Sequence, residues 1–366
     1  MKQGWEYKKL GEVCDIINGK NQRAVENPKG IYPIMGSGGI IGYADDYLCN
    51  EGTTIIGRKG SINKPIYVNQ KFWNVDTAFG LQPKEGTESR FLFYLCKSIN
   101  FERYNKSVTI PSLVKSDLLK IDIHIPYFSV QKQIASELDL LSGVIEKQKA
   151  QLEELDKLAQ SIFYDMFGDP VANEKGWEMK KLGEECEDMK YGTSRPACEN
   201  GRYKYLRMGN ITLDGHLDLA DLKTIDIPEE EVEKCIVRYG DILFNRTNSH
   251  ELIGKTCMFD LDEPMIIAGY IIRVRLSENL KPIFISIMFN LPSMKKLLRS
   301  IAKGAVNQAN INSKELASIN IIIPSLSLQQ EFAAKVEAIE AMKAKVRQSL
   351  KEVETLFNER MDYYFN

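Results

Sequence analysis

The sequence predicts an α+β protein in which two α/β units are joined by two long antiparallel coiled-coil helices, with an internal repeat of approximate twofold symmetry. Three observations lead to this fold class. A stretch near the N-terminus recurs in the middle of the chain, two segments carry a heptad pattern, and short β-rich runs lie between them. At 366 residues, 43% of them hydrophobic, the chain can form two domains of ordinary size with real cores.

The repeat is clearest at the start of each half. Nine of the eleven residues in 4–14, GWEYKKLGEVC, are identical in 176–186, GWEMKKLGEEC, at an offset of 172. A second match joins 116–126 to 314–324 at an offset of 198, which also relates two residue pairs further along, Gln131 with Gln329 and Ala135 with Ala333. The ends of the two halves are alike and the middles are not. This pattern favours two recognition units for different targets on one scaffold.

The matches divide the chain into four segments. Residues 1–126 and 171–324 are the predicted globular units, and residues 127–170 and 325–366 are the predicted tails. Lysine and arginine set against aspartate and glutamate give these units net charges of +4 and −1, and the tails −4 and −1. Since no segment is strongly basic, charge alone does not indicate a nucleic-acid-binding protein.

The first tail predicts a coiled-coil helix. From Ile134 to Met166, nine of the ten residues at two heptad positions are apolar, and no proline interrupts them before Pro170. At 1.5 Å per residue, this span is about 48 Å long. The expected helix seam comprises Leu138, Leu141, Ile145, Leu152, Leu155 and Ile162.

The second tail repeats this pattern. Its expected seam comprises Val336, Ile339, Val346, Leu350, Val353 and Phe357. Gln148, Lys343 and Arg360 are polar exceptions in the two seams, and they could fix the register. An amphipathic helix can also pack on its own domain. Two tails of near-equal length, each with a narrow seam, favour packing on each other.

Short β-rich runs separated by turn residues predict strands in both units. In the first unit they cover 31–35, 53–56, 65–68 and 76–81, and a helix is expected at 89–98. In the second unit strands are expected at 205–208, 241–244, 255–259, 265–268 and 271–276, with a helix at 283–301 that Pro292 could break. Because the strands arrive in runs and do not alternate with helices, a doubly wound sheet is not expected.

Motifs for catalysis and metal binding are missing. The glycine-rich loop 36–39 lacks a βαβ frame, and the near match to a phosphate-binding loop at 249–256 lacks its first glycine. His250-Glu251 begins like a zinc-protease motif but has no second histidine at the required spacing. The seven cysteines contain no C-x-x-C pair. We therefore expect no catalytic residue, no metal site and no cofactor bound by this chain.

The sequence shows no sign of a membrane span. No run approaches 18 apolar residues, and the first residues, MKQGWEYKKLGEVCD, lack the apolar stretch of a signal peptide. The expectation is a soluble cytoplasmic protein.

Polar and basic residues in the predicted loops suit contact with DNA. Lysine and arginine neutralise phosphates, arginine can grip guanine through paired hydrogen bonds, and asparagine or glutamine can read adenine. The candidates in the first unit are Lys20, Asn21, Gln22, Arg58, Lys59, Thr109 and Ser112. Those in the second are Tyr191, Thr193, Arg195, Arg207, Asn210, Asn245, Arg246, Asn248, Asn307 and Asn310. For each of them an ordinary solvated loop is the alternative interpretation.

Two doubled motifs resemble a known family. The frame G-W-E-x-K-K-L-G-E and the pattern L-x-x-I-x-I-x-I-P-x-x-x-x-Q before a heptad helix are both similar to specificity (S) subunits of type I restriction-modification systems. The resemblance covers essentially the whole chain. In addition, 55–60 (IIGRKG) and 241–248 (DILFNRTN) look like motifs of that family's target recognition domains.

The resemblance implies a role for each segment. Residues 1–126 and 171–324 would be target recognition domains, each reading one half of a bipartite, asymmetric DNA site. Residues 127–170 and 325–366 would be helical spacers that set the distance between the half-sites and dock two methyltransferase (M) subunits.

The resemblance also assigns catalysis to the partners. The M subunits use S-adenosylmethionine, typically on adenine N6, and restriction (R) subunits, joined through the complex of two M and one S subunit, use ATP and Mg. Two alternatives stay open. The chain could be a detached recognition region of a fused, type IIG-like methyltransferase-nuclease, or a scaffold that binds proteins and not DNA.

Overall fold

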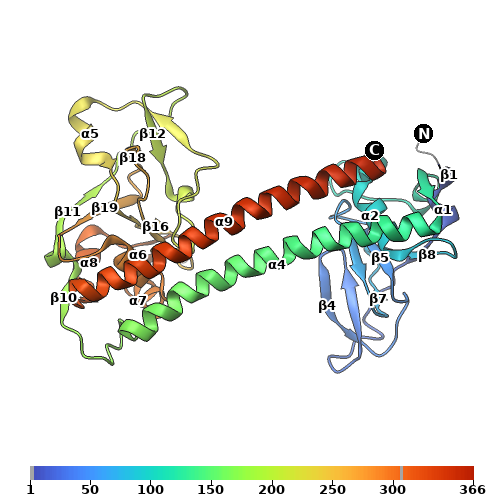
Figure 1. Ribbon diagram of the computed structural model, residues 1–366, viewed down its shortest axis with the longest axis horizontal. Coiled ribbons are helices and arrows are strands. Elements are labelled where there is room, and N and C mark those ends of the chain that lie inside the picture. The colour runs from blue at the N-terminus through green and yellow to red at the C-terminus, as the bar shows by residue number, and fades with distance from the viewer. Residues whose placement is uncertain (1–3, 306–307) are drawn as a thin grey trace. The chain divides into compact units, whose positions relative to one another are not determined.

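The computed structural model describes residues 4–305 and 308–366, and it divides into two compact units (Figure 1). Unit 1 comprises the chain up to Lys149 together with Arg347–Asn366, and unit 2 is Ala150–Val346. Two 40-residue helices, α4 (Phe128–Phe167) and α9 (Leu326–Phe365), each contribute residues to both units. Among the described residues, no helix is long and apolar enough to cross a bilayer.

In each unit the two repeated motifs form strands that pair with each other. β1 (Trp5–Lys9) runs antiparallel to β9 (Asp122–Pro126) in unit 1, and β10 (Met179–Lys181) to β22 (Asn320–Ile322) in unit 2. A short helical turn follows the first strand, α1 (Leu10–Val13) or η2 (Leu182–Glu185). The first N–H of this turn donates to Ile121 O or Ile319 O at 2.9 Å in both units. The two motifs recur together because each one is the backbone partner of the other.

The predicted β-rich runs form a four-stranded antiparallel sheet in each unit, here called the central sheet. Its strand order in unit 1 is β2 (Cys14–Asn18), β8 (Ala78–Pro83), β5 (Thr53–Gly57) and β6 (Ile66–Val68). In unit 2 the order is β11 (Cys186–Tyr191), β19 (Ile271–Leu276), β15 (Ile242–Asn245) and β17 (Thr256–Met258). In both sheets the last strand in sequence, β8 or β19, lies between the first two, β2 and β5 or β11 and β15.

A second sheet also follows one plan. In unit 1 its order is β4 (Gly39–Ala44), β3 (Tyr32–Gly36) and β7 (Trp73–Asn74); in unit 2 it is β13 (Lys223–Ile225), β12 (Tyr203–Leu206), β18 (Met265–Ile267) and β14 (Ile236–Val237). β3 pairs with β7, and β12 with β18, in parallel. The middles of the two halves therefore share their strand order although their sequences do not match.

The remaining elements are short. Unit 1 contains η1 (Phe101–Tyr104) and α3 (Lys115–Leu118). Unit 2 adds a sheet of β16 (Thr247–Asn248), β21 (Gln308–Asn310) and β20 (Lys303–Ala305), and the helical segments η3 (Met208–Asn210), α5 (Glu229–Cys235), α7 (Pro292–Ile301) and α8 (Ser313–Ala317).

A buried glutamine fixes the helix that follows the central sheet in both units. The Gln131 amide donates to Gly86 O at 3.1 Å and to Pro126 O at 2.9 Å, and it accepts from the Glu88 N–H at 2.8 Å, where α2 (Ser89–Ser98) begins. Gln329 makes the same three bonds, to Asn279 O, Pro324 O and the Lys281 N–H, where α6 (Pro282–Asn290) begins. Hence α2 and α6 are counterparts, with Glu88 matched to Lys281.

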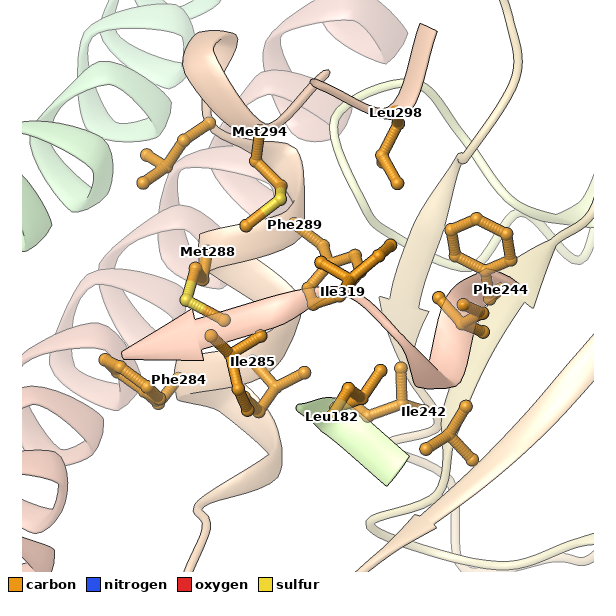
Figure 2. Close-up of a cluster of buried hydrophobic side chains, with 14 of the residues drawn as sticks. Leu182, Ile242, Phe244, Phe284, Ile285, Met288, Phe289, Met294, Leu298 and Ile319 are labelled. Atoms are coloured by element: carbon orange, nitrogen blue, oxygen red, sulfur yellow. The ribbon is translucent and has the colours of Figure 1, made fainter. Parts of the chain in front are cut away.

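The main core of unit 2 lies between α6, α7 and the central sheet. Figure 2 shows Phe284, Ile285, Met288 and Phe289 of α6 gathered with Leu182, Ile242 and Ile319. The end of α4 adds Phe163 and Phe167, and the start of α9 adds Phe332 and Val336. In unit 1 the start of α4 supplies Ile134 and Leu138, and the end of α9 packs Phe357, Met361 and Phe365 on the same core.

All the predicted seam residues of the two tails are buried or half-buried. The three predicted polar exceptions each contact the facing long helix. Gln148 donates to Ser349 Oγ at 2.6 Å and Arg360 pairs with Glu137 at 2.9 Å in unit 1, and Lys343 pairs with Asp156 at 2.5 Å in unit 2. Packing on the unit's own core and contact with the other long helix both occur, so the two interpretations of the tails are not exclusive.

One predicted element needs a correction. The strand expected at 205–208 ends at Leu206, because Met208–Asn210 forms a 3-10 turn. The helix expected at 283–301 is broken at Pro292, as the sequence allowed: it forms two helices separated at Leu291, since Pro292 has no N–H to donate and starts α7. Paired strands rich in charged residues, such as β1, were missed because their sequences lack the expected run of β-branched residues.

Candidate DNA interface

The DNA-contact candidates that follow the first two central-sheet strands in sequence, β2 and β5 or β11 and β15, lie at one end of each sheet. In unit 1 the last residues of β2 and β5 pair with the start of β8, Asn18 with Phe79 and Gly57 with Ala78. In unit 2 the ends of β11 and β15 pair with the start of β19 in the same way. Segments 20–22 and 58–59 are thus brought together, as are segments 191–195 and 245–248.

Arg58 has a defined backbone frame in unit 1. Its N–H donates to Thr77 O at 2.8 Å, and its carbonyl accepts from the Leu113 N–H at 2.9 Å. A backbone bridge also joins Lys59 to Ser112. This frame ties together three elements that are distant in sequence and places Arg58, Lys59 and Ser112 side by side.

Arg246 has the same frame in unit 2. Its N–H donates to Tyr270 O at 2.9 Å, and its carbonyl accepts from the Ile311 N–H at 2.9 Å. The next residue, Thr247, pairs with Asn310 as Lys59 pairs with Ser112. Arg58 and Arg246 therefore occupy equivalent positions, although their separation of 188 residues matches neither repeat offset.

An aromatic ring lies under each of the two arginines. The Arg58 guanidinium is 5.7 Å from the Phe79 ring centre, and that of Arg246 is 4.8 Å from the Tyr191 ring centre. Tyr191 is anchored in turn, because its hydroxyl accepts from the Ser313 N–H at 2.7 Å. Both arginines are half-buried, and the rings restrict their side chains. We call the end of each central sheet that carries Arg58 or Arg246 the arginine end.

The loop after the first central strand is also built alike in the two units. Gly19 and Gly192 follow β2 and β11, and a Cβ on either would lie about 2 Å from a backbone carbonyl oxygen, of Val75 or Ile267. Beyond Gly19, Lys20 and Asn21 are exposed and Gln22 is half-buried. This loop adds polar side chains to the arginine end of unit 1.

Three candidates of unit 2 are buried. Asn245 has no exposed surface, and Asn210 and Thr193 are 3% and 6% exposed. The Asn210 amide accepts from the Arg207 N–H at 2.8 Å and donates to Asp218 O at 2.8 Å, which is a structural role. In this conformation the three side chains are not accessible to a DNA base.

Two basic candidates of unit 2 are held by carboxylates. Arg195 makes two hydrogen bonds to Glu231, at 2.7 and 3.2 Å, and the guanidinium lowers the pKa of that carboxyl. Arg207 pairs with Asp221 at 2.7 Å, and Lys223 and Arg207 together lower the pKa of Asp221. Contact with a phosphate would require either arginine to exchange its partner.

The other candidates lie near the arginine ends. Thr109 is exposed and Ser112 half-buried, in the segment that pairs with Arg58 and Lys59. Asn248 and Asn310 are half-buried, and the Asn310 side chain accepts from the Thr247 hydroxyl at 2.9 Å. Asn307 lies outside the described residues.

Sequence reasoning missed three residues near these loops. Tyr270 is 53% exposed and its carbonyl orients Arg246. Lys255 donates to Met208 O at 2.9 Å, and Lys295 donates to Gly254 O at 2.6 Å. Burial lowers the pKa of Lys295 to about 7. Of these three residues only Lys255 could have been identified from the sequence, because it is a basic residue next to a polar loop.

The side chains of the arginine ends are chemically suited to binding DNA. Guanidinium, ammonium and amide groups suit phosphate oxygens and base edges. Among the described residues no group of His, Cys, Asp and Glu is arranged to hold a metal ion. All seven cysteines are free thiols, and burial raises the pKa of both Cys14 and Cys186 to about 12, which makes these thiols unreactive.

Comparison with known proteins identifies the family. Residues 2–157 and 174–355 both match the type I restriction modification DNA specificity domain. The chain is 25% identical over 308 residues to the EcoKI specificity subunit of Escherichia coli, covering 77% of this chain and 66% of that protein. It is 26% identical to the MjaVIII specificity subunit of Methanocaldococcus jannaschii, covering 92% and 86%.

A solved structure has the same fold. The S subunit of a type I restriction-modification system from M. genitalium superposes with a TM-score of 0.64 at 16% identity, covering 99% of this chain and 96% of that one. The mixed α/β architecture with two repeated domains is thus shared, and in this family catalysis resides in partner subunits. The chain belongs to the family of type I restriction-modification DNA specificity subunits.

Proposed function

We propose that each unit reads one half of a bipartite, asymmetric DNA site with its arginine end. In unit 1 the reading surface comprises Lys20, Asn21, Gln22, Arg58, Lys59, Thr109 and Ser112. In unit 2 it comprises Tyr191, Arg246, Asn248 and Asn310, with Arg195 and Arg207 as phosphate contacts that exchange their carboxylate partners. The observation that carries the proposal is the common frame of Arg58 and Arg246, each held by the same pair of backbone hydrogen bonds.

The surroundings of the two arginines argue for unlike half-sites. Arg58 is followed by Lys59 and a glycine turn, whereas Arg246 is followed by the short strand β16 and the amide of Asn248. A lysine offers only donors, and an asparagine offers both a donor and an acceptor to an adenine edge. One backbone frame with different neighbours is suited to reading two different sequences.

The long helices are the proposed spacer. Residues 127–170 and 325–366 would form an antiparallel coiled coil with approximate twofold symmetry, and residues 1–126 and 171–324 would be the target recognition domains. The polar contacts of Gln148, Lys343 and Arg360 support this pairing, since each fixes one helix against the other at a single register. The coiled coil would then set the gap between the two half-sites.

The helices also offer surface for partners. Leu140 is 71% exposed on α4, and Met342 is 45% exposed on α9. Exposed apolar residues on a charged helix favour a protein partner. We infer that two M subunits dock along the spacer, carry out S-adenosylmethionine-dependent methylation, and recruit R subunits that use ATP and Mg. The proposed place of action is the cytoplasm.

Substitution of each arginine tests the proposal. In the complex with M subunits, Arg58→Ala and Arg246→Ala should each weaken DNA binding by about 5- to 150-fold, which corresponds to about 1–3 kcal/mol for a base-reading arginine. Each variant should relax methylation at one half-site and leave the other intact. Lys9→Ala and Lys181→Ala are matched controls, since they remove one positive charge each from the β1–β9 and β10–β22 strand pairs.

Two results would contradict the proposal. Unchanged affinity in both arginine variants would remove the arginine ends from the interface. No DNA binding by the wild-type complex would favour the protein-interaction scaffold instead.

A further inference from the structure

Unit 2 contains a cavity of about 460 Å³ beneath the two long helices. Its wall combines residues of α4, α6 and α9 with the loops around Gly215, Gly240 and Asp260. Apolar side chains such as Ile283 and Ile287 form part of the wall, and the carboxylates of Glu337 and Asp260 form another part. A volume of this size suits a small organic molecule.

The internal repeat identifies the residues of unit 1 that correspond to the cavity wall of unit 2. Gln131 and Gln329 match the tails at an offset of 198, and Glu88 and Lys281 match α2 to α6 at an offset of 193. The counterparts of Ile283 and Ile287 are therefore Arg90 and Tyr94. The counterparts of Glu337 and Ala159 are Asp139 and Phe357.

In unit 1 these counterparts form a cation-carboxylate site. The Arg90 guanidinium donates from Nε to both oxygens of Asp139, at 2.8 and 3.0 Å, and it lies 4.4 Å from the Tyr67 ring centre. The Tyr94 hydroxyl donates to Asp139 at 2.6 Å, and the Tyr94 and Phe357 rings are 6.1 Å apart. The Arg90 guanidinium, which lies among aromatic rings, thus neutralises the Asp139 carboxylate on α4.

Unit 2 keeps the carboxylate, as Glu337, but has Ile283 where unit 1 has the cation Arg90. Isoleucines stand where Arg90 and Tyr94 would be, and alanine stands in place of Phe357, so three large side chains have become smaller ones. In the part of the chain that the structure describes, no ion pair involves Glu337.

One of the two lysines of the cavity is already paired with other carboxylates. Lys343, which is 2% exposed, pairs with Asp156 at 2.5 Å and with Glu340 at 2.7 Å. Five carboxylates line the cavity against two lysines. The balance of charge favours a positively charged ligand.

We propose that this cavity binds a small organic cation whose amidinium, guanidinium or ammonium group is carried on an apolar or aromatic body. The charged group pairs with Glu337, as Arg90 pairs with Asp139, and the body rests on Ile283, Ile287 and Ala159 where Tyr94 and Phe357 lie in unit 1. This site is distinct from the arginine end, so the inference does not rest on DNA recognition.

Benzamidine is a suitable probe, because it joins an amidinium to an aromatic ring, and benzamide is its neutral match. With the full-length chain, isothermal titration should show benzamidine binding at least 10-fold tighter than benzamide. Glu337→Gln should weaken benzamidine binding at least 10-fold. Glu331→Gln, on the same helix but paired with Lys335 outside the cavity, should leave it unchanged.

Filling the cavity provides a second measurement. The double variant Ile283→Arg with Ile287→Tyr installs the pair found in unit 1, and Ala159→Phe installs the ring of Phe357. Each should abolish benzamidine binding while the far-ultraviolet circular dichroism spectrum stays that of the wild type. Equal binding of benzamide, undetectable binding of benzamidine at 10 mM, or equal effects of the Glu337 and Glu331 variants would overturn the proposal.

Discussion

Unit 1 and unit 2 share the arrangement of their strands, and they differ in the loops and side chains built on those strands. Matched hydrogen bonds show how the offset between equivalent residues grows along the chain. It is 172 at the first motif, 188 at Arg58 and Arg246, 193 at Glu88 and Lys281, and 198 at Leu113 and Ile311. The extra residues of unit 2 are thus distributed over several connections. Insertions are tolerated there because the strand pairing of the central sheet stays the same.

The comparison teaches which contacts define the scaffold. The strand pair β1–β9, the buried glutamine and the central sheet recur in both units, whereas the loops beyond the strands differ. Function can diverge in those loops without a change in the core.

The largest expected effect comes from exchanging one unit's recognition segment. Replacing residues 1–126 with the corresponding segment of another specificity subunit should change the sequence of one half-site completely and leave the other as it was. The reason is that each arginine end is built from residues of its own unit. Methylome sequencing of a host that carries the variant and its M partner is the measurement. If both half-sites changed, the units would not be independent readers.

A second contrast concerns the ends of the two long helices. Phe167, at the end of α4, is fully buried and contacts the rings of Phe163, Trp177, Phe284 and Phe332. Phe167→Ala should therefore lower the free energy of unfolding of unit 2 by about 3–5 kcal/mol.

Its counterpart in unit 1 is held less tightly. Phe365 is half-buried and its ring packs at a tilt against that of Phe91, with 5.4 Å between the ring centres, so Phe365→Ala should cost about 1–2 kcal/mol. Urea unfolding followed by tryptophan fluorescence compares the two, because Trp177 touches Phe167 and Trp5 packs on Phe91. Equal losses would mean that the two helix ends are packed alike.

The sequence predicted the parts of the fold that repeat or follow a period. The heptad seams placed α4 and α9 within a few residues of their ends, and the repeat identified the paired motifs. The equivalence of Arg58 and Arg246 could not be read from the sequence, because it depends on hydrogen bonds to segments 19 to 65 residues away. The burial of Asn245 was likewise invisible, since an asparagine that ends a strand can point inward or outward.

Two equivalent glycines offer a third contrast. A Cβ on Gly11 would lie 2.7 Å from Leu119 Cδ2, and one on Gly183 would lie 2.8 Å from Ala317 Cβ. The leucine can rotate away, but the alanine methyl is fixed to its backbone. Gly183→Ala should therefore cost about 1–3 kcal/mol, as overpacked sites do, and Gly11→Ala less. Thermal unfolding of both variants beside the wild type gives the ranking, and a larger loss for Gly11→Ala would reverse this interpretation.

The last contrast separates the units by the pH dependence of their stability. Helix α7 follows α6 in unit 2, whereas the short η1 follows α2 in unit 1. Lys295 on α7 has a pKa of about 7 because burial disfavours its charge, so the unfolded chain binds the proton more strongly than the folded one. The stability of the wild type should therefore rise with pH from about 7 towards the ordinary lysine value, by at most about 1.4 kcal/mol per pH unit.

The variant Lys295→Met removes this dependence. It should be at least as stable as the wild type at pH 7, and the difference should shrink or reverse by pH 9.5, because folding of the wild type releases the Lys295 proton and this release costs less free energy as the pH rises. Lys296→Met, at the exposed neighbouring position, is the matched control and should keep the wild-type slope. Urea titrations at the two pH values measure the slopes. A slope in Lys295→Met equal to that of the control would show that the ammonium is solvated, and that α7 adds no buried charge to unit 2.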